Sequence, residues 1–129
     1  MTSFNRPQSL AAVAEAASDA EAFSFALRNF LDAFYAAPSA DRLTDEPQRL
    51  AAALSDDGLA DSYVAALAEH LARQFRFQKP EWVRSPDRTM KKPWFSMRSH
   101  AGRMFLLTES PASFRQRNIF ISADALCRA

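Results

Sequence analysis

Four basic and three large aromatic side chains lie within residues 82–95, in a stretch of the chain (residues 77–99) that prolines interrupt. The basic residues are Arg84, Arg88, Lys91 and Lys92, and the aromatic ones are Trp82, Trp94 and Phe95. Basic groups that contact phosphates, together with rings that stack on bases, are typical of proteins that bind single-stranded nucleic acid. The sequence favours another interpretation, in which the tryptophans are buried anchors and the basic residues form a solvated rim, because tryptophan flanked by proline usually serves packing.

Two more basic residues, Arg115 and Arg117, lie near the end of the chain. They are two positions apart on an expected short helix, so their side chains should diverge. We expect one of them to pair with Glu109 or with a helix C-terminus and the other to face a partner. The predicted partner-binding residues are therefore Arg84, Arg88, Lys91, Lys92, Arg115 and Arg117.

No pattern of catalytic or metal-binding residues accompanies these basic side chains. The two glycines of the chain are too few for a glycine-rich loop around a phosphate. The two histidines, His70 and His100, have no cysteine or carboxylate at the spacing of metal ligands. Asp56, Asp57 and Asp61 could bind a cation, but acidic residues at a helix N-terminus explain them better. We therefore expect a protein that is not an enzyme and has neither a cofactor nor a metal site.

The charges are divided unevenly between the two halves of the chain. Residues 1–70 include eleven acidic and four basic residues, a net −7, whereas residues 71–129 include four acidic and twelve basic residues, a net +8. A basic half can bind nucleic acid or an acidic protein. The alternative is that the two halves pack together and partly neutralise each other.

Length and composition predict one soluble domain that spans residues 1–129. No stretch approaches the roughly 20 apolar residues that span a bilayer. The first residues lack the basic and apolar regions of a secretory signal. The single cysteine, Cys127, allows no internal disulfide. We therefore expect a cytoplasmic protein in a reducing environment.

The hydrophobic pattern predicts an all-α fold, a compact bundle of four to five helices with a long Pro/Trp-containing connection and a short C-terminal helix. Valine and isoleucine total five, too few for a substantial sheet. A first short helix begins near Leu10 and ends near Ser18, which has the capping-box spacing to Glu21 for a second helix. The apolar face of that second helix consists of Phe23, Ala26, Leu27, Phe30, Leu31 and Phe34.

The middle of the chain predicts two further helices. Pro47 suits the first turn of a helix that includes Leu50 and Leu54. Residues 56–58, Asp-Asp-Gly, should form a turn. The next helix should run from about Leu59 to Phe75, with an apolar stripe along one side.

The C-terminal part has weaker periodicity. Residues 103–108 could form a short helix or a short buried strand. Ser110 and Pro111 are typical of a helix start, with Ser110 as the cap. Asn118 tolerates left-handed geometry and can end that helix. The apolar residues 119–121 should be buried, and a final turn should follow them.

Five segments of the chain carry a resemblance to a known family. They are residues 26–35, residues 61–72, Pro80-Glu81-Trp82, Pro93-Trp94-Phe95 and residues 109–120, which include Phe114-Arg115-Gln116-Arg117-Asn118. Through them the chain resembles a family of small bacterial proteins that tend to be encoded beside a nucleotidyltransferase-fold protein, as in a toxin–antitoxin module. Many relatives have a second proline before the first tryptophan, whereas this chain has Lys79-Pro80-Glu81. The resemblance implies a protein partner and adds no catalytic residue.

We accordingly expect a non-enzymatic cytoplasmic binding protein, an antitoxin-like neutraliser of a neighbouring nucleotidyltransferase-fold protein. The basic C-terminal half would then cover an acidic metal- and nucleotide-binding cleft, with Arg115 or Lys91 and Lys92 reaching its carboxylates. The alternative is a nucleic-acid-binding regulator that uses the same basic half.

Overall fold

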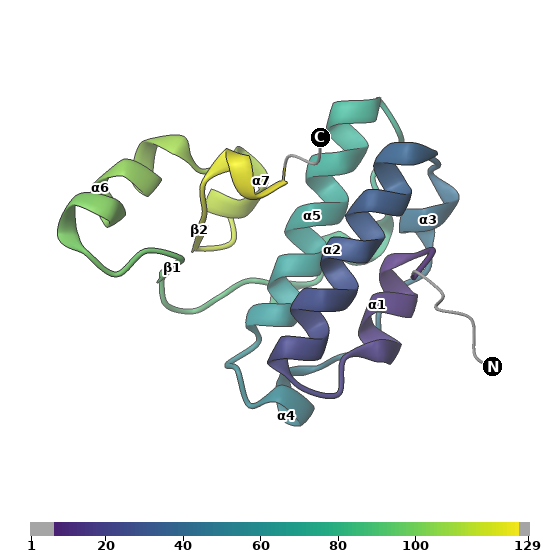
Figure 1. Ribbon diagram of the computed structural model, residues 1–129, viewed down its shortest axis with the longest axis horizontal. Helices are drawn as coiled ribbons and strands as arrows, with labels where there is room; N and C mark the ends of the chain where they lie inside the picture. Colours follow the sequence, from purple (N-terminus) through teal and green to yellow (C-terminus); the bar gives the residue numbers. More distant parts are fainter. Residues whose placement is uncertain (1–6, 127–129) are drawn as a thin grey trace.

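The computed structural model describes residues 7–126, and helices dominate it (Figure 1). The α-helices are α1 (Leu10–Ala16), α2 (Ala20–Ala36), α3 (Asp41–Thr44), α4 (Ala51–Leu54), α5 (Leu59–Phe75), α6 (His100–Glu109) and α7 (Ala112–Arg115). The 3-10 helices are η1 (Glu81–Arg84), η2 (Pro86–Arg88) and η3 (Ala123–Leu126), and the strands are β1 (Trp94–Phe95) and β2 (Ile119–Phe120). The predicted helical fold is therefore confirmed. Within the described part of the chain, no helix is long and apolar enough to cross a membrane, and Cys127 lies outside that part.

The two longest helices, α2 and α5, lie side by side, and α1 packs against α2 (Figure 1). The face of α2 that is buried consists of the six residues that its periodicity predicts. Helix α5 has the predicted bounds, but 11 of its 17 residues are buried. It is enclosed because α4, η1, η2 and α7 contact it in addition to α2. We call α1 to α5 together the helical body.

The cap of α2 differs from the prediction by one residue. Asp19, and not Ser18, is the N-cap, and its carboxylate accepts a hydrogen bond from the Ala22 amide at 2.7 Å. Ser18 belongs to the turn that ends α1, where its own amide donates to the Ala16 carbonyl. Each side chain at such a position satisfies a free amide of the first helical turn.

The segment before α5 contains the clearest error of the sequence prediction. Pro47 does not begin a helix, because residues 46–50 have no regular secondary structure and the Pro47 carbonyl accepts a hydrogen bond from Arg88. Helix α4 begins only after Leu50, and the short helix α3 was not predicted. The predicted turn is present, with Asp57 and Gly58 both in the left-handed region at φ of 60° and 87°.

The predicted long connection follows α5 and packs against it through η1 and η2. It then forms β1, which pairs in parallel with β2 in the register Trp94↔Ile119 and Phe95↔Phe120. These two-residue strands were not predicted, since a pair so short leaves no periodicity in the sequence.

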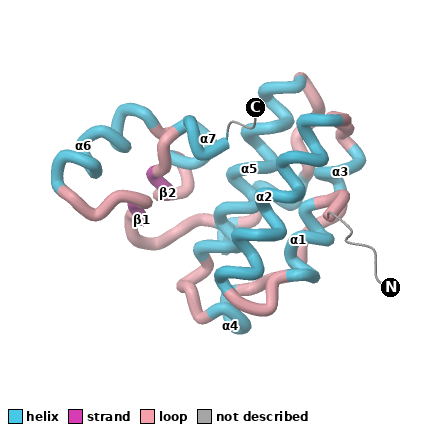
Figure 2. Tube along the Cα trace, viewed as in Figure 1, coloured by secondary structure: helices cyan, strands magenta, loops and turns pink. Residues whose placement is uncertain are grey.

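Residues 91–110, which we call the arm, extend away from the helical body and include β1 and α6 (Figures 1 and 2). Of the two alternatives for residues 103–108, the structure has the helix. Ser110 ends α6 and does not cap α7, because its hydroxyl donates to the Leu106 carbonyl at 2.6 Å. Asn118 is left-handed at φ 63°, as predicted.

Candidate functional site

Arg88, predicted to bind a partner, is an internal residue. Its side chain is 0% exposed and donates to the carbonyls of Asp61 and Pro47, at 3.1 and 2.6 Å. It also pairs with Glu46 at 3.2 Å and covers the Trp82 ring. Burial lowers the pKa of this guanidinium, and the Glu46 hydrogen bond opposes that change. Arg88 therefore fastens the extended segment around Pro47 to α5, and the prediction that it contacts a partner is corrected.

Arg117 is the second predicted partner residue that the structure places inside. It is 6% exposed and donates to Glu69 at 2.8 Å and to the carbonyls of Ser113 and Val83 at 2.9 and 2.8 Å. Thus one of the two C-terminal arginines is paired, as predicted, but with Glu69 and not with Glu109. Arg117 joins α5, η1 and the segment that follows α7.

Glu69 is the acidic centre of this junction. Its carboxylate also lies 2.7 Å from Arg73 and 3.7 Å from Lys79. Burial raises the pKa of Glu69, but the hydrogen bond from Arg117 and the three positive charges outweigh burial, so the pKa is lowered. Sequence analysis missed Glu69, because nothing in its neighbours marks it as the partner of a residue 48 positions away.

Asp61 is another carboxylate whose role the sequence did not show. It is buried and accepts hydrogen bonds from the amides of Leu50 and Ala51, at 2.7 and 3.2 Å. It therefore supplies the N-terminal cap that α4 lacks locally. This contact explains Asp61 without a cation, and no cluster of three metal-ligating side chains occurs in residues 7–126.

The four other predicted partner residues, Arg84, Lys91, Lys92 and Arg115, are exposed. They do not all share one site. Arg84 lies at a shallow hollow together with Glu46, Arg49 and Glu81. Lys91 and Lys92 belong to the arm, and Arg115 lies on α7.

The arm exposes apolar side chains that sequence analysis did not select. Among the described residues, five large apolar side chains are exposed, and four of them lie on the arm: Met97, Met104, Phe105 and Leu107. Each of the four is between 40% and 54% exposed. Large exposed apolar side chains scattered singly are normal on a protein surface, whereas four of them on one short segment indicate a binding surface. The sequence does contain a signal, since four consecutive apolar residues, 104–107, cannot all face inward on a helix.

Specific contacts hold the arm in place. The amides of Trp94 and Ser96 donate to the carbonyls of Asn118 and Phe120, at 2.8 and 3.0 Å. The rings of Phe95 and Phe120 stack with centroids 4.7 Å apart. The arm is thus attached to residues 117–120, which Arg117 fastens to the body.

Gly102 closes the turn at the start of α6. A Cβ atom at this position would lie 2.8 Å from the Met97 Cβ and 2.9 Å from the Ser99 hydroxyl. Ser99 is the N-cap of α6 and accepts a hydrogen bond from the Gly102 amide at 3.0 Å. The turn between β1 and α6 is therefore compact, which fixes where Met97 lies.

The arm also exposes basic side chains. Lys91, Lys92, Arg98 and Arg103 are exposed there, and Glu109 is the one acidic residue, so the arm has a net charge of +3. Arg103 lies over the Phe95 ring, 5.5 Å from its centroid. An apolar centre with a basic rim complements a surface that is apolar and acidic.

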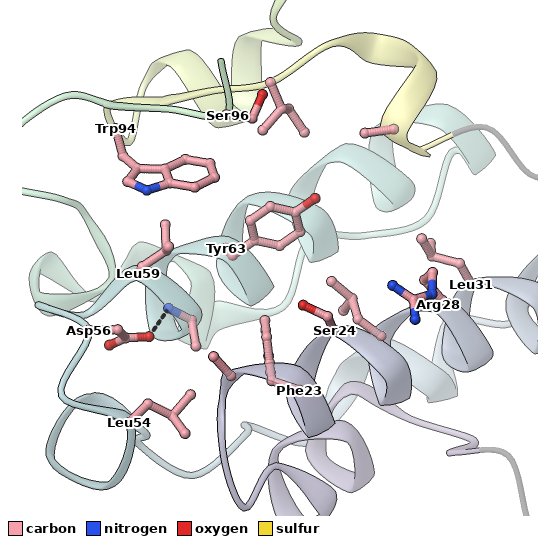
Figure 3. A pocket seen from close by; sticks show the side chains of 15 residues that line it. Phe23, Ser24, Arg28, Leu31, Leu54, Asp56, Leu59, Tyr63, Trp94 and Ser96 are labelled. Carbon is pink, nitrogen blue, oxygen red and sulfur yellow. Dashed lines mark hydrogen bonds between the residues drawn. The ribbon is translucent and has the colours of Figure 1, made fainter. Parts of the chain in front are cut away.

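A pocket of about 410 Å³ lies beside the base of the arm (Figure 3). It is lined by α2 and α5 on one side and by Trp94 of β1, Ser96, Ile121 and Ala125 of η3 on the other. Trp94 lines this pocket and is half-buried, whereas Trp82 is buried and its indole N–H donates to the Leu43 carbonyl at 3.1 Å.

No protein-family model, no curated protein and no solved structure matches this chain. The chemistry of the surfaces must therefore indicate what the protein binds.

Proposed function

We propose that the protein is a non-enzymatic binding protein whose arm docks on an acidic surface of a protein partner. The observation that carries the proposal is the exposure of Met97, Met104, Phe105 and Leu107 on an arm that also exposes four basic residues. Methionine and aromatic side chains are enriched at the buried centre of protein interfaces, where a few of them supply most of the binding energy. The charged rim then sets orientation and association rate.

We further propose that the partner is the nucleotidyltransferase-fold neighbour that the family resemblance implies, so that the protein acts like an antitoxin. A cleft that binds metal and nucleotide is lined with carboxylates, which the lysines at positions 91 and 92 could pair with. The arm offers a helix with an exposed apolar face, and such helices commonly bind in grooves. Docking there would exclude the substrate from the cleft.

The geometry favours a protein partner over nucleic acid, the alternative function. Stacking on bases requires exposed rings, but Trp82 is buried, Trp94 lines a pocket and Phe95 stacks on Phe120. Two of the six predicted phosphate-contacting residues are internal. What remains exposed on α6 includes aliphatic side chains, which suit a protein interface.

The test is co-purification with the neighbouring gene product, followed by titration of arm variants. Phe105→Ser and Met104→Ser should each weaken binding about 30-fold, the effect of losing a central interface residue. Phe25→Ser, which changes the exposed phenylalanine on α2, is the matched control and should leave binding unchanged. Charge reversal at Lys91, Lys92 and Arg115 should mainly slow association and reduce its salt dependence.

Two results would overturn the proposal. One is full-strength binding of the partner by both arm variants. The other is tight, salt-sensitive retention of DNA or RNA at about 0.15 M salt, where charges more than roughly 8 Å apart are largely screened.

A further inference from the structure

The pocket beside the arm has the size and lining of a small-molecule site. Its volume of about 410 Å³ lies within the range of roughly 300–1,000 Å³ that is typical of ligand pockets. Most of its wall is apolar, formed by Phe23, Leu27, Leu31, Leu54, Leu59 and Ile121. These side chains come from the helical body and from Ile121, which follows β2, so the pocket is built from segments far apart in the sequence.

Several polar side chains at this pocket have no hydrogen-bond partner among the described residues. They are the hydroxyls of Ser24, Tyr63 and Ser96, the Trp94 indole N–H and the exposed Arg28 guanidinium. The one acidic residue of the wall, Asp56, is already satisfied, because its carboxylate accepts hydrogen bonds from the amides of Gly58 and Ala60 at 3.0 and 2.9 Å. Each of the other polar groups can donate a hydrogen bond, and one of them, Arg28, is a cation.

Arg28 and Trp94 lie toward opposite ends of the pocket. Ser24 and Arg28 are four residues apart on α2 and hence on one face of that helix. Figure 3 shows them on the α2 side, with Leu31 beside Arg28, whereas Trp94 and Leu59 lie toward the other end and Tyr63 lies between. Burial raises the pKa of Tyr63 to about 12, so its hydroxyl stays protonated and can donate a hydrogen bond at neutral pH.

We propose that this pocket binds an amphipathic monocarboxylate, of the class of medium-chain fatty acids. The carboxylate would accept hydrogen bonds from Arg28 and Tyr63, and the hydrocarbon chain would lie among the leucines and against Trp94. A cationic ligand would be repelled by the charge of Arg28, and a purely apolar one would offer the Tyr63 hydroxyl no hydrogen-bond partner. The site is separate from the exposed apolar face of the arm and does not depend on the function proposed for it.

The experiment is a titration of the full-length protein with decanoate below its micellar concentration, followed by calorimetry and by tryptophan emission. Trp94 should report binding, since Trp82 is enclosed and bonded to Leu43. We expect saturable binding of decanoate and at least about tenfold weaker binding of decanol, which has the same chain without the charge. Decylamine should bind no better than decanol.

Two variants test the named groups. Arg28→Gln should weaken decanoate binding by about tenfold or more and leave decanol binding unchanged, because a hydrogen-bonded charge pair is lost. Tyr63→Phe should weaken decanoate binding less than Arg28→Gln does. The phenylalanine ring should retain the contacts that Tyr63 makes with Phe23 and Phe114, so the shape of the pocket should be preserved. Arg84→Gln, at an exposed arginine outside the pocket, is the matched control.

The outcomes are distinct. Equal affinity for decanoate and decanol would show a merely apolar cavity and overturn the carboxylate site. An equal loss in Arg28→Gln and Arg84→Gln would show nonspecific attraction of anions and also overturn it. Absence of saturable binding at millimolar decanoate would overturn the pocket as a ligand site altogether.

Discussion

The helical body and the arm differ in how they are stabilised. In α2, six of 17 residues are buried in the common core, whereas in α6 only Leu106 of ten residues is buried. The body is stabilised by its own apolar interior. The arm is held by a two-residue strand pair and a ring stack, and it leaves apolar side chains in water. The arm therefore contributes little to the stability of the fold, and its exposed side chains are available for binding.

The arginines show the same division. Arg88 and Arg117 are buried in the body or at its junction with the arm, where they bind backbone carbonyls and carboxylates. Lys91, Lys92 and Arg98 are exposed along the arm. Basic residues that are alike in the sequence thus have two roles. Some are buried and connect segments of the fold, and others are exposed on the arm.

The largest effect should come from the core of the body. Phe30→Ala should lower the free energy of unfolding by about 3–5 kcal/mol, because Phe30 is fully buried. Phe105→Ala on the arm should lower it by less than about 0.5 kcal/mol. Urea unfolding monitored by circular dichroism measures both. Similar losses at the two sites would show that α6 is part of the core and would remove the contrast between body and arm.

A somewhat smaller effect should come from the junction. Arg117→Met should lower the free energy of unfolding by about 3 kcal/mol, since it leaves the Glu69 carboxylate buried without its main partner. Arg115→Met, at the exposed arginine two residues earlier, is the control and should change it by less than about 0.5 kcal/mol. Hydrogen exchange adds a sharper observation. The amides of Trp94 and Ser96 should exchange faster in Arg117→Met, and if they do not, Arg117 does not hold the arm.

Elements with strong local signals were predictable. The bounds of α5 and the buried face of α2 follow from periodicity alone, because a helix that packs on one side repeats its apolar residues every three to four positions. The turn before α5 follows from the preference of aspartate and glycine for left-handed geometry.

Features that depend on distant partners were not predictable. Pro47 looked like a helix start, but Arg88, 41 positions away, binds its carbonyl. The buried position of Arg117 could not be predicted for the same reason. Whether an arginine is exposed or buried depends on its partners, here Glu69 and a carbonyl elsewhere in the chain. The pocket is lined by α2, α5 and residues near β1 and β2. No local sequence pattern predicts that these segments lie close together.

The smallest effect should be the response of the junction to acid. Because the folded state lowers the pKa of Glu69, this carboxylate contributes stability that is present above its ordinary value of 4.5 and is lost as pH falls through the lowered value. Asp87, whose hydrogen bonds with Arg49 and Ser85 lower its pKa from 3.8 to about 2, should act in the same direction at lower pH. The free energy of unfolding of the native protein should therefore decrease below about pH 4.5.

Glu69→Gln distinguishes the junction from the rest of the molecule. The variant cannot titrate at this position, so its stability should decrease less steeply with acid than that of the native protein, whereas Asp87→Asn should retain the decrease due to Glu69. Hydrogen exchange should show where the loss occurs. Protonation of Glu69 weakens its bond to Arg117, so the Trp94 and Ser96 amides should lose protection at a higher pH than the core amides of α5. If arm and core lose protection together, the junction opens only when the whole protein unfolds, and the arm is more firmly part of the body than its exposed side chains indicate.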